Sequence, residues 1–148
     1  FMKVDMSNTK ILIPAFSTVE CLFEVANKFS DISDSLHNVL RGFSSEKDVS
    51  TQKAYALITE EYGLRTRLAI LKGDSESRLV YGVNSSHESF ISLLSETEAL
   101  IKRMKNIDEI AYLINSISVI CICIFPGKEK KLDFLISTLR DEINQLKK

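Results

Sequence analysis

The sequence predicts an all-α fold, a single-domain bundle of four to five helices. In several long segments the apolar residues recur at alternating spacings of three and four, which is typical of helices packed nearly parallel. Only 5 glycines and 2 prolines occur in 148 residues, and so few favour long helices over many short strands. The most apolar run, residues 107–125, keeps the same spacing and becomes apolar on every side after Ile117. We expect it to be a buried central helix, about 107–125.

That run has two alternative interpretations. Its second half, 116–125, is rich in β-branched residues, and a short apolar run of this kind also suits a buried strand. A membrane-spanning helix is disfavoured because the uninterrupted part, 110–125, is shorter than the roughly 20 residues that a bilayer needs. A helix in a protein core is therefore the preferred interpretation, and we do not expect a membrane partner.

The chain begins with a predicted extended leader, residues 1–16, because Pro14 disfavours helix at the residue before it. The bundle domain is predicted to cover residues 17–148. Its first helix, about 18–41, starts at a capping box formed by Ser17 and Glu20 and ends at Gly42. The apolar stripe of this helix comprises Leu22, Val25, Phe29, Ile32, Leu36, Val39 and Phe43.

The second helix, about 49–72, is predicted to start at a cap provided by Ser45 or Asp48 and to stop before Gly73. It carries two apolar stripes, and two stripes predict contact with two neighbouring helices. The first stripe comprises Leu57, Leu64, Leu68 and Leu71, and the second comprises Tyr55, Ile58 and Tyr62.

Residues 74–84 form the longest irregular stretch, in which 78–83 is either a short strand or an ordered loop. A capping box of Ser85 and Glu88 starts a third helix, and another of Asn106 and Glu109 starts a fourth. Because so little chain separates them, these helices are either separate or one bent helix. A last helix, about 128–146, follows; its stripe comprises Leu132, Ile136, Leu139, Ile143 and Leu146.

Composition excludes several classes of function. The formal net charge of -1 and the pI of about 6.2 provide no electrostatic footprint for nucleic acid. Three cysteines, an odd number, argue against a disulfide-stapled secreted domain and favour a reducing, cytoplasmic location. Cys121 and Cys123 are two apart and on a helix point in different directions, so they do not suit one metal ion. We expect no metal and no cofactor.

Standard catalytic motifs are absent from the sequence. Of its two histidines, His37 is expected on the solvent side of the first helix, and His87, in the first turn of the third, has no neighbouring nucleophile or orienting partner. One polar group interrupts an apolar helix, with Glu61 in a slot of the leucine stripe where an apolar residue is due. Its functional interpretation is a polar site in the bundle interior, with Glu61 paired to Arg65, that an enzyme could use; its structural interpretation is an ordinary surface ion pair between residues four apart. This possible polar site comprises Glu60, Glu61, Arg65 and Arg67.

The outer side of the first helix is acidic and includes one exposed aromatic residue, Phe23, which is how the anchor of a docking surface looks. This predicted partner-binding face comprises Glu20, Phe23, Glu24, Asp31 and Asp34. The leading hypothesis is a protein–protein interaction module for a basic partner, such as an inhibitor or immunity-type factor, a secretion chaperone or an adaptor. The alternatives are the enzyme above and a homo-oligomeric structural bundle that uses the tyrosine stripe of the second helix as its interface.

Overall fold

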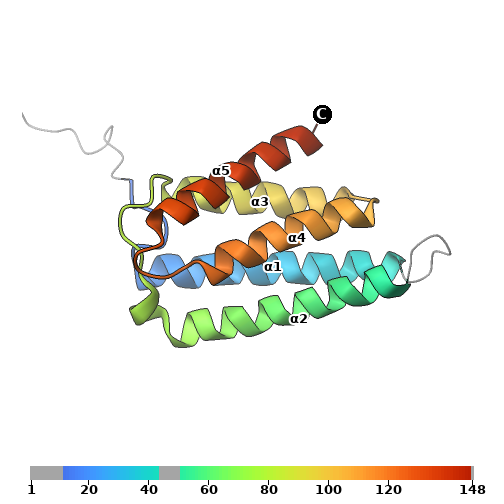
Figure 1. Ribbon diagram of the computed structural model, residues 1–148, viewed down its shortest axis with the longest axis horizontal. Helices are drawn as coiled ribbons and strands as arrows, with labels where there is room; N and C mark the ends of the chain where they lie inside the picture. The colour runs from blue at the N-terminus through green and yellow to red at the C-terminus, as the bar shows by residue number, and fades with distance from the viewer. Residues whose placement is uncertain (1–11, 44–50, 148) are drawn as a thin grey trace, which may run out of the picture.

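The computed structural model describes residues 12–43 and 51–147, and these form an all-α bundle without strands, as predicted. Its five α-helices lie roughly along one common axis (Figure 1). They are α1 (Val19–Phe43), α2 (Thr51–Gly73), α3 (His87–Arg103), α4 (Ile107–Ile122) and α5 (Glu129–Leu146), with a 3-10 turn η1 (Ser75–Arg78) after α2.

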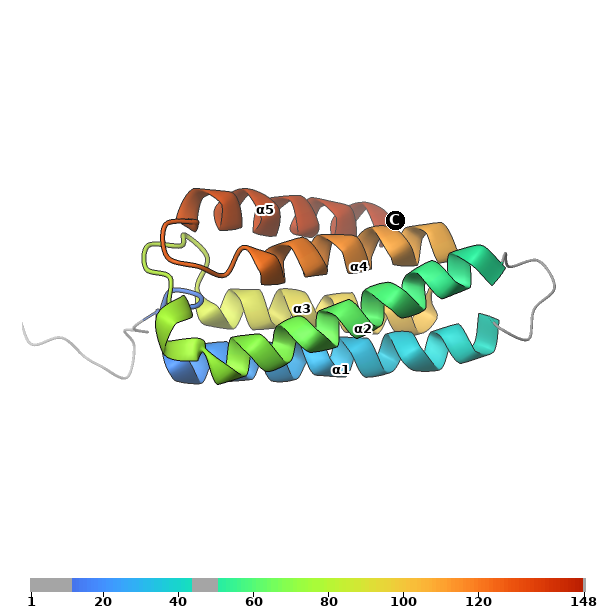
Figure 2. The same ribbon diagram turned by 60° about the horizontal axis from the view of Figure 1, so that its bottom comes forward.

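The five helices form a closed ring around the core (Figures 1 and 2). Helix α1 packs between α2 and α3, α4 packs between α2 and α5, and α5 closes the ring against α3. Helices α1, α3 and α5 run in one direction, and α2 and α4 run in the other. Each helix therefore has two main neighbours and one outward side.

The ring corrects the expectation of a fully buried central helix over 107–125. Helix α4 ends at Ile122, and no strand forms after it, so the strand alternative is wrong. Ile110, Ile114 and Ile117 are fully buried, but the outward side of the segment is exposed at Val119, Ile122 and Phe125. The expectation that every side is buried after Ile117 is wrong, because α4 is one wall of the ring rather than its centre.

The segment before α1 joins the core. Ala15 and Phe16 are fully buried, and the Phe16 ring lies edge-on to Phe90 with 5.0 Å between the ring centroids. The backbone of this segment pairs with the loop before α3: Ala15 N–H donates to the Ser85 carbonyl at 3.0 Å, and His87 N–H donates to the Ile13 carbonyl at 2.7 Å. Residues 1–11 of the predicted leader lie outside the described residues.

Two of the three predicted capping boxes are displaced by one residue. Thr18, not Ser17, caps α1 by accepting a hydrogen bond from Cys21 N–H at 3.0 Å. Ser86, not Ser85, caps α3, since its backbone is extended and its hydroxyl accepts from Ser89 N–H at 3.1 Å. Asn106 caps α4 as predicted, accepting from the N–H groups of residues 108 and 109.

The segment between α2 and α3 is an ordered loop, not a strand, and it buries Val80 and Val83. Helices α3 and α4 are separate and run in opposite directions, joined by residues 104–106. The predicted caps of α2, Ser45 and Asp48, fall outside the described residues. No helix within the described ranges is long and apolar enough to cross a membrane.

Helix α2 contacts two neighbouring helices, α1 and α4, as predicted, but the expectation that the second stripe makes one of these contacts is wrong for its two tyrosines. Tyr55 and Tyr62 are 65% and 63% exposed, and only Ile58 is partly buried. The contacts with α1 and α4 instead involve other residues of α2: Arg65 binds Asp34 of α1, and Lys53 binds Asp108 of α4. The outward side of α2 is thus left open.

Cysteine reactivity tests this packing. Burial raises the pKa of the Cys121 thiol to about 11, because apolar surroundings disfavour the thiolate. At pH 8 about one Cys121 in a thousand is then ionised, and its sulfur is also sterically protected. We expect maleimide to label the partly exposed Cys123 first in the native protein, as read by peptide mass mapping. All three cysteines should react in urea; equal native rates at Cys121 and Cys123 would contradict this packing.

Candidate functional site

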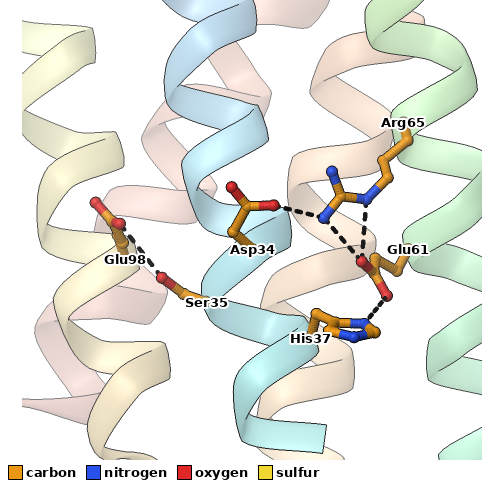
Figure 3. Close-up of polar contacts among 6 residues, drawn as sticks. All are labelled: Asp34, Ser35, His37, Glu61, Arg65 and Glu98. Atoms are coloured by element: carbon orange, nitrogen blue, oxygen red, sulfur yellow. Dashed lines mark hydrogen bonds and ion pairs between the residues drawn. The ribbon is translucent and has the colours of Figure 1, made fainter.

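A charged network lies in the seam between α1 and α2 (Figure 3). Glu61 of α2 is only 2% exposed, and its carboxylate accepts hydrogen bonds from the Arg65 guanidinium at 3.0 Å. The same guanidinium donates to Asp34 Oδ1 of α1 at 2.7 Å, and His37 Nδ1 lies 3.4 Å from Glu61 Oε2. The antiparallel packing of α1 and α2 brings these four side chains together although 31 positions separate Asp34 from Arg65.

The network compensates a buried charge. A carboxylate without partners inside a protein is costly, and Arg65 supplies the opposite charge. The hydrogen bond to Asp34, followed by that to Glu61, raises the pKa of Arg65 against the opposing effect of its burial. The sequence interpretation that places Glu61 in an interior slot paired with Arg65 agrees with this geometry, whereas the simple surface pair does not.

The four residues of the predicted polar site are not brought together. Glu61 and Arg65 face α1, but Glu60 lines a groove against α4 with Lys53, Asp108 and Asn115. Arg67 also turns toward α4, where its charge acts on Cys121. The site therefore divides between the two flanks of α2.

The buried carboxylate orients His37, whose side chain is 52% exposed. A carboxylate and an imidazole are the orienting part of a general-base site. A catalytic site also needs a nucleophile or a substrate cavity beside the imidazole. A groove of about 580 Å³ between the C-terminal ends of α1 and α3 is lined by Ser35, Asn38 and Lys102 among others, but not by His37 or Glu61.

The predicted acidic face of α1 points outward in full. All five of its members are exposed, and Phe23 is 43% exposed among the carboxylates. Two of these carboxylates also contact neighbouring helices: Asp34 binds Arg65 of α2, and Glu24 Oε2 lies 3.0 Å from His87 Nε2 of α3. Glu20 and Asp31 have no ion-pair partner among the described residues and remain available to a partner.

The environment of the two histidines differs from the sequence interpretation, which assigned neither of them a partner. His37 faces Glu61, and His87 faces Glu24 across the α1–α3 contact. On the same flank, Ser35 of α1 donates to Glu98 of α3 at 3.3 Å (Figure 3). These pairs join residues 24 and 63 positions apart, so no local pattern in the sequence signals them.

The outward side of α2 carries the two exposed tyrosines, Tyr55 and Tyr62. Between Lys53 and Lys72, every exposed residue of this helix is uncharged; they are Tyr55, Ala56, Thr59, Tyr62, Thr66, Ala69 and Ile70. The hydroxyls of Thr59 and Thr66 donate to the carbonyls of Tyr55 and Tyr62 in their own helix, at 3.0 and 3.1 Å. Their donor protons are thus already satisfied, and the surface they leave is largely apolar.

The described part of the chain holds no group of three or more His, Cys, Asp or Glu side chains that could bind a metal ion. The chain matches no protein-family model, no curated protein and no solved structure in the comparisons. The site itself therefore carries the functional argument.

Proposed function

We propose that this chain is a protein-binding module that docks a basic partner protein through the outward side of α1 and α2. The observation that carries the proposal is the pairing of two adjacent helix faces, one acidic with an exposed Phe23 and one uncharged and rich in tyrosine. An exposed helix normally presents charged residues to water. A long exposed face without charges is therefore typical of a surface that a partner protein covers.

The charges indicate the character of the partner. Glu20 and Asp31 are exposed on α1, the helix that packs beside α2, and have no ion-pair partner in the described residues, so complementary lysines or arginines would be steered toward them. Nucleic acid would be repelled by the same carboxylates, since its binding depends on neutralising phosphates. A cytoplasmic location is part of the proposal, supported by three free cysteines, two of them buried.

Reversing the charges of the rim tests the proposal. We expect Glu20→Lys combined with Asp31→Lys to weaken partner capture by about 10-fold, corresponding to roughly 1.4 kcal/mol from two exposed ion pairs that become repulsive. The measurement is quantitative mass spectrometry of proteins retained by the immobilised chain from cells that naturally produce it. Retention of the specific partner should also fall with added salt.

The matched control is Glu109→Lys combined with Asp141→Lys, which changes the net charge equally on α4 and α5. Glu20 and Glu109 both lie in the first turn of a helix, and Asp31 and Asp141 both lie exposed within one. The two double variants should therefore lose similar stability at the helix N-termini. Equal retention of the same proteins by both variants would refute docking through α1.

A further inference from the structure

Six exposed residues of α2 form a regular stripe on the side of the helix away from its buried leucines. Tyr55, Thr59, Tyr62, Thr66, Ala69 and Gly73 are spaced four, three, four, three and four, and all six are exposed. We call these six residues the α2 seam. An alternation of four and three is the spacing by which one helix packs along another in a coiled coil. The leucine stripe on the inner side of the same helix has this period and is buried in the bundle.

We infer that the α2 seam receives one α-helix of the partner protein, and that a lysine- or arginine-bearing edge of that helix lies over the acidic face of α1. This inference rests on the proposed function and names the element of the partner that binds. Docking of an amphipathic helix against an apolar helical surface is a common mode of recognition. Exposed tyrosines suit it, because they supply large contact areas at interfaces.

The shape of the seam supports a helix as its occupant. Tyr55 and Tyr62 are seven residues apart, about two helical turns, and the smaller Thr59 lies between them on the same side of the helix. Toward its C-terminal end the seam narrows to Ala69 and Gly73, and a side chain added at Gly73 would meet nothing within 4 Å. Side chains of an incoming helix could pack between the two tyrosines, and the backbone of that helix could approach closely at Ala69 and Gly73.

The charges favour a basic helix over a second copy of this chain. Helices α1 and α2 pack side by side and run in opposite directions (Figure 2). Asp34 binds Arg65 and Asn27 binds Lys72, so residues 20–34 of α1, which hold the acidic face, lie beside the C-terminal half of α2 and of the seam. In an antiparallel two-fold pairing of two seams, the same flank meets the same flank, so the two acidic faces would oppose each other wherever the C-terminal halves of the seams overlap. In a parallel pairing, Tyr55 and Tyr62 would each meet their own copy, and the paired rings would hold the helices apart at that end. At the other end, Gly73 would meet Gly73 and leave the space between the helices unfilled. A basic helix meets neither obstacle.

Two synthetic peptides test the inference with the full chain. Each is an amphipathic helix of about three heptads with leucine and alanine at its seam positions, and the two differ only in one edge, which carries lysine in one and glutamate in the other. Binding is measured by the fluorescence anisotropy of a dye on the peptide. We expect the lysine peptide to bind at least about 10-fold more tightly than the glutamate peptide. Equal affinities, or no binding of either, would overturn the inference.

The seam is tested by Tyr62→Gln combined with Ala69→Gln, which changes its shape without adding charge. Both sites are exposed, and glutamine is a good helix former, so the fold should persist. We expect the affinity for the lysine peptide to fall at least about 10-fold. The matched control, Tyr81→Gln combined with Ala99→Gln, changes the same residue types at exposed sites elsewhere and should bind as wild type does.

The outcomes also separate this inference from the proposed function. If the α1 charge reversals weaken capture of the cellular partner but the seam variant captures and binds normally, docking through α1 stands and the seam inference fails. If light scattering shows a dimer that the seam variant dissociates, the occupant is a second copy and the inference is overturned. Loss of both peptide binding and partner capture in the seam variant supports it.

Discussion

Replacing Phe16 by alanine is expected to lower the free energy of unfolding by about 3–5 kcal/mol, the usual cost of removing a buried phenylalanine. Phe16 is 0% exposed and contacts the Phe90 ring, which itself lies edge-on to Phe29 at 6.3 Å between centroids. This aromatic cluster joins the segment before α1 to α1 and α3. Its loss should lower the melting temperature by about 10 °C in a chain of this size.

Urea unfolding followed by far-UV circular dichroism measures this change, and Phe23→Ala is the matched control. Phe23 is the same residue type on an exposed site of α1, so its truncation should cost less than about 1 kcal/mol. Similar losses in the two variants would contradict the placement of residue 16 in the core. Phe16 has a φ of 67°, so Phe16→Gly should be no worse than Phe16→Ala, because glycine adopts this backbone without strain.

The positions of the helices could be predicted from sequence because the relevant signal is local. A stripe such as that from Leu22 to Phe43 requires only that neighbouring turns of one helix face the same way. Helix boundaries were less accurate at the caps, where tertiary contacts intervene. Ser85 cannot serve as predicted for this reason: the next residue is the one with the extended capping backbone, and the Ser85 carbonyl binds the segment before α1.

The order of the helices in the ring could not be predicted in this way. Helices α3 and α4 follow one another in the chain, yet their main contacts are with α1, α2 and α5. A stripe shows that a surface is apolar, but it does not identify what covers it. The tyrosines of α2 illustrate this limit of local patterns, since the same stripe describes an internal contact and a surface open to a partner.

The features of the candidate site likewise fall into two groups, those that local sequence patterns predict and those that depend on helix packing. The burial of Glu61 follows from its place between Leu57 and Leu64, and the outward direction of the acidic face follows from helix geometry. The contacts of Glu61 with Asp34 through Arg65, and with His37, depend on how α1 and α2 pack. Such pairings lie beyond any local pattern.

Replacing Arg65 by methionine is the second substitution with a large expected effect, a loss of about 2–4 kcal/mol in the free energy of unfolding. Removing one partner of a buried ion pair leaves an uncompensated charge, here the Glu61 carboxylate, and typically costs about 3–5 kcal/mol. We lower that figure because the Arg65 side chain is 37% exposed and partly screened by water. Arg67→Met, on the α4 flank of the same helix, is the control and should cost less than about 1 kcal/mol.

The double variant Glu61→Leu with Arg65→Met decides whether the network is structural. Leucine at position 61 continues the inner stripe of α2, and replacement of a buried ion pair by apolar residues is often neutral. We expect its stability to return to within about 1 kcal/mol of wild type. Because neither residue belongs to the α2 seam, its affinity for the lysine peptide should stay within about twofold of wild type. A double variant that folds normally but loses the peptide would instead place the buried network within the binding surface.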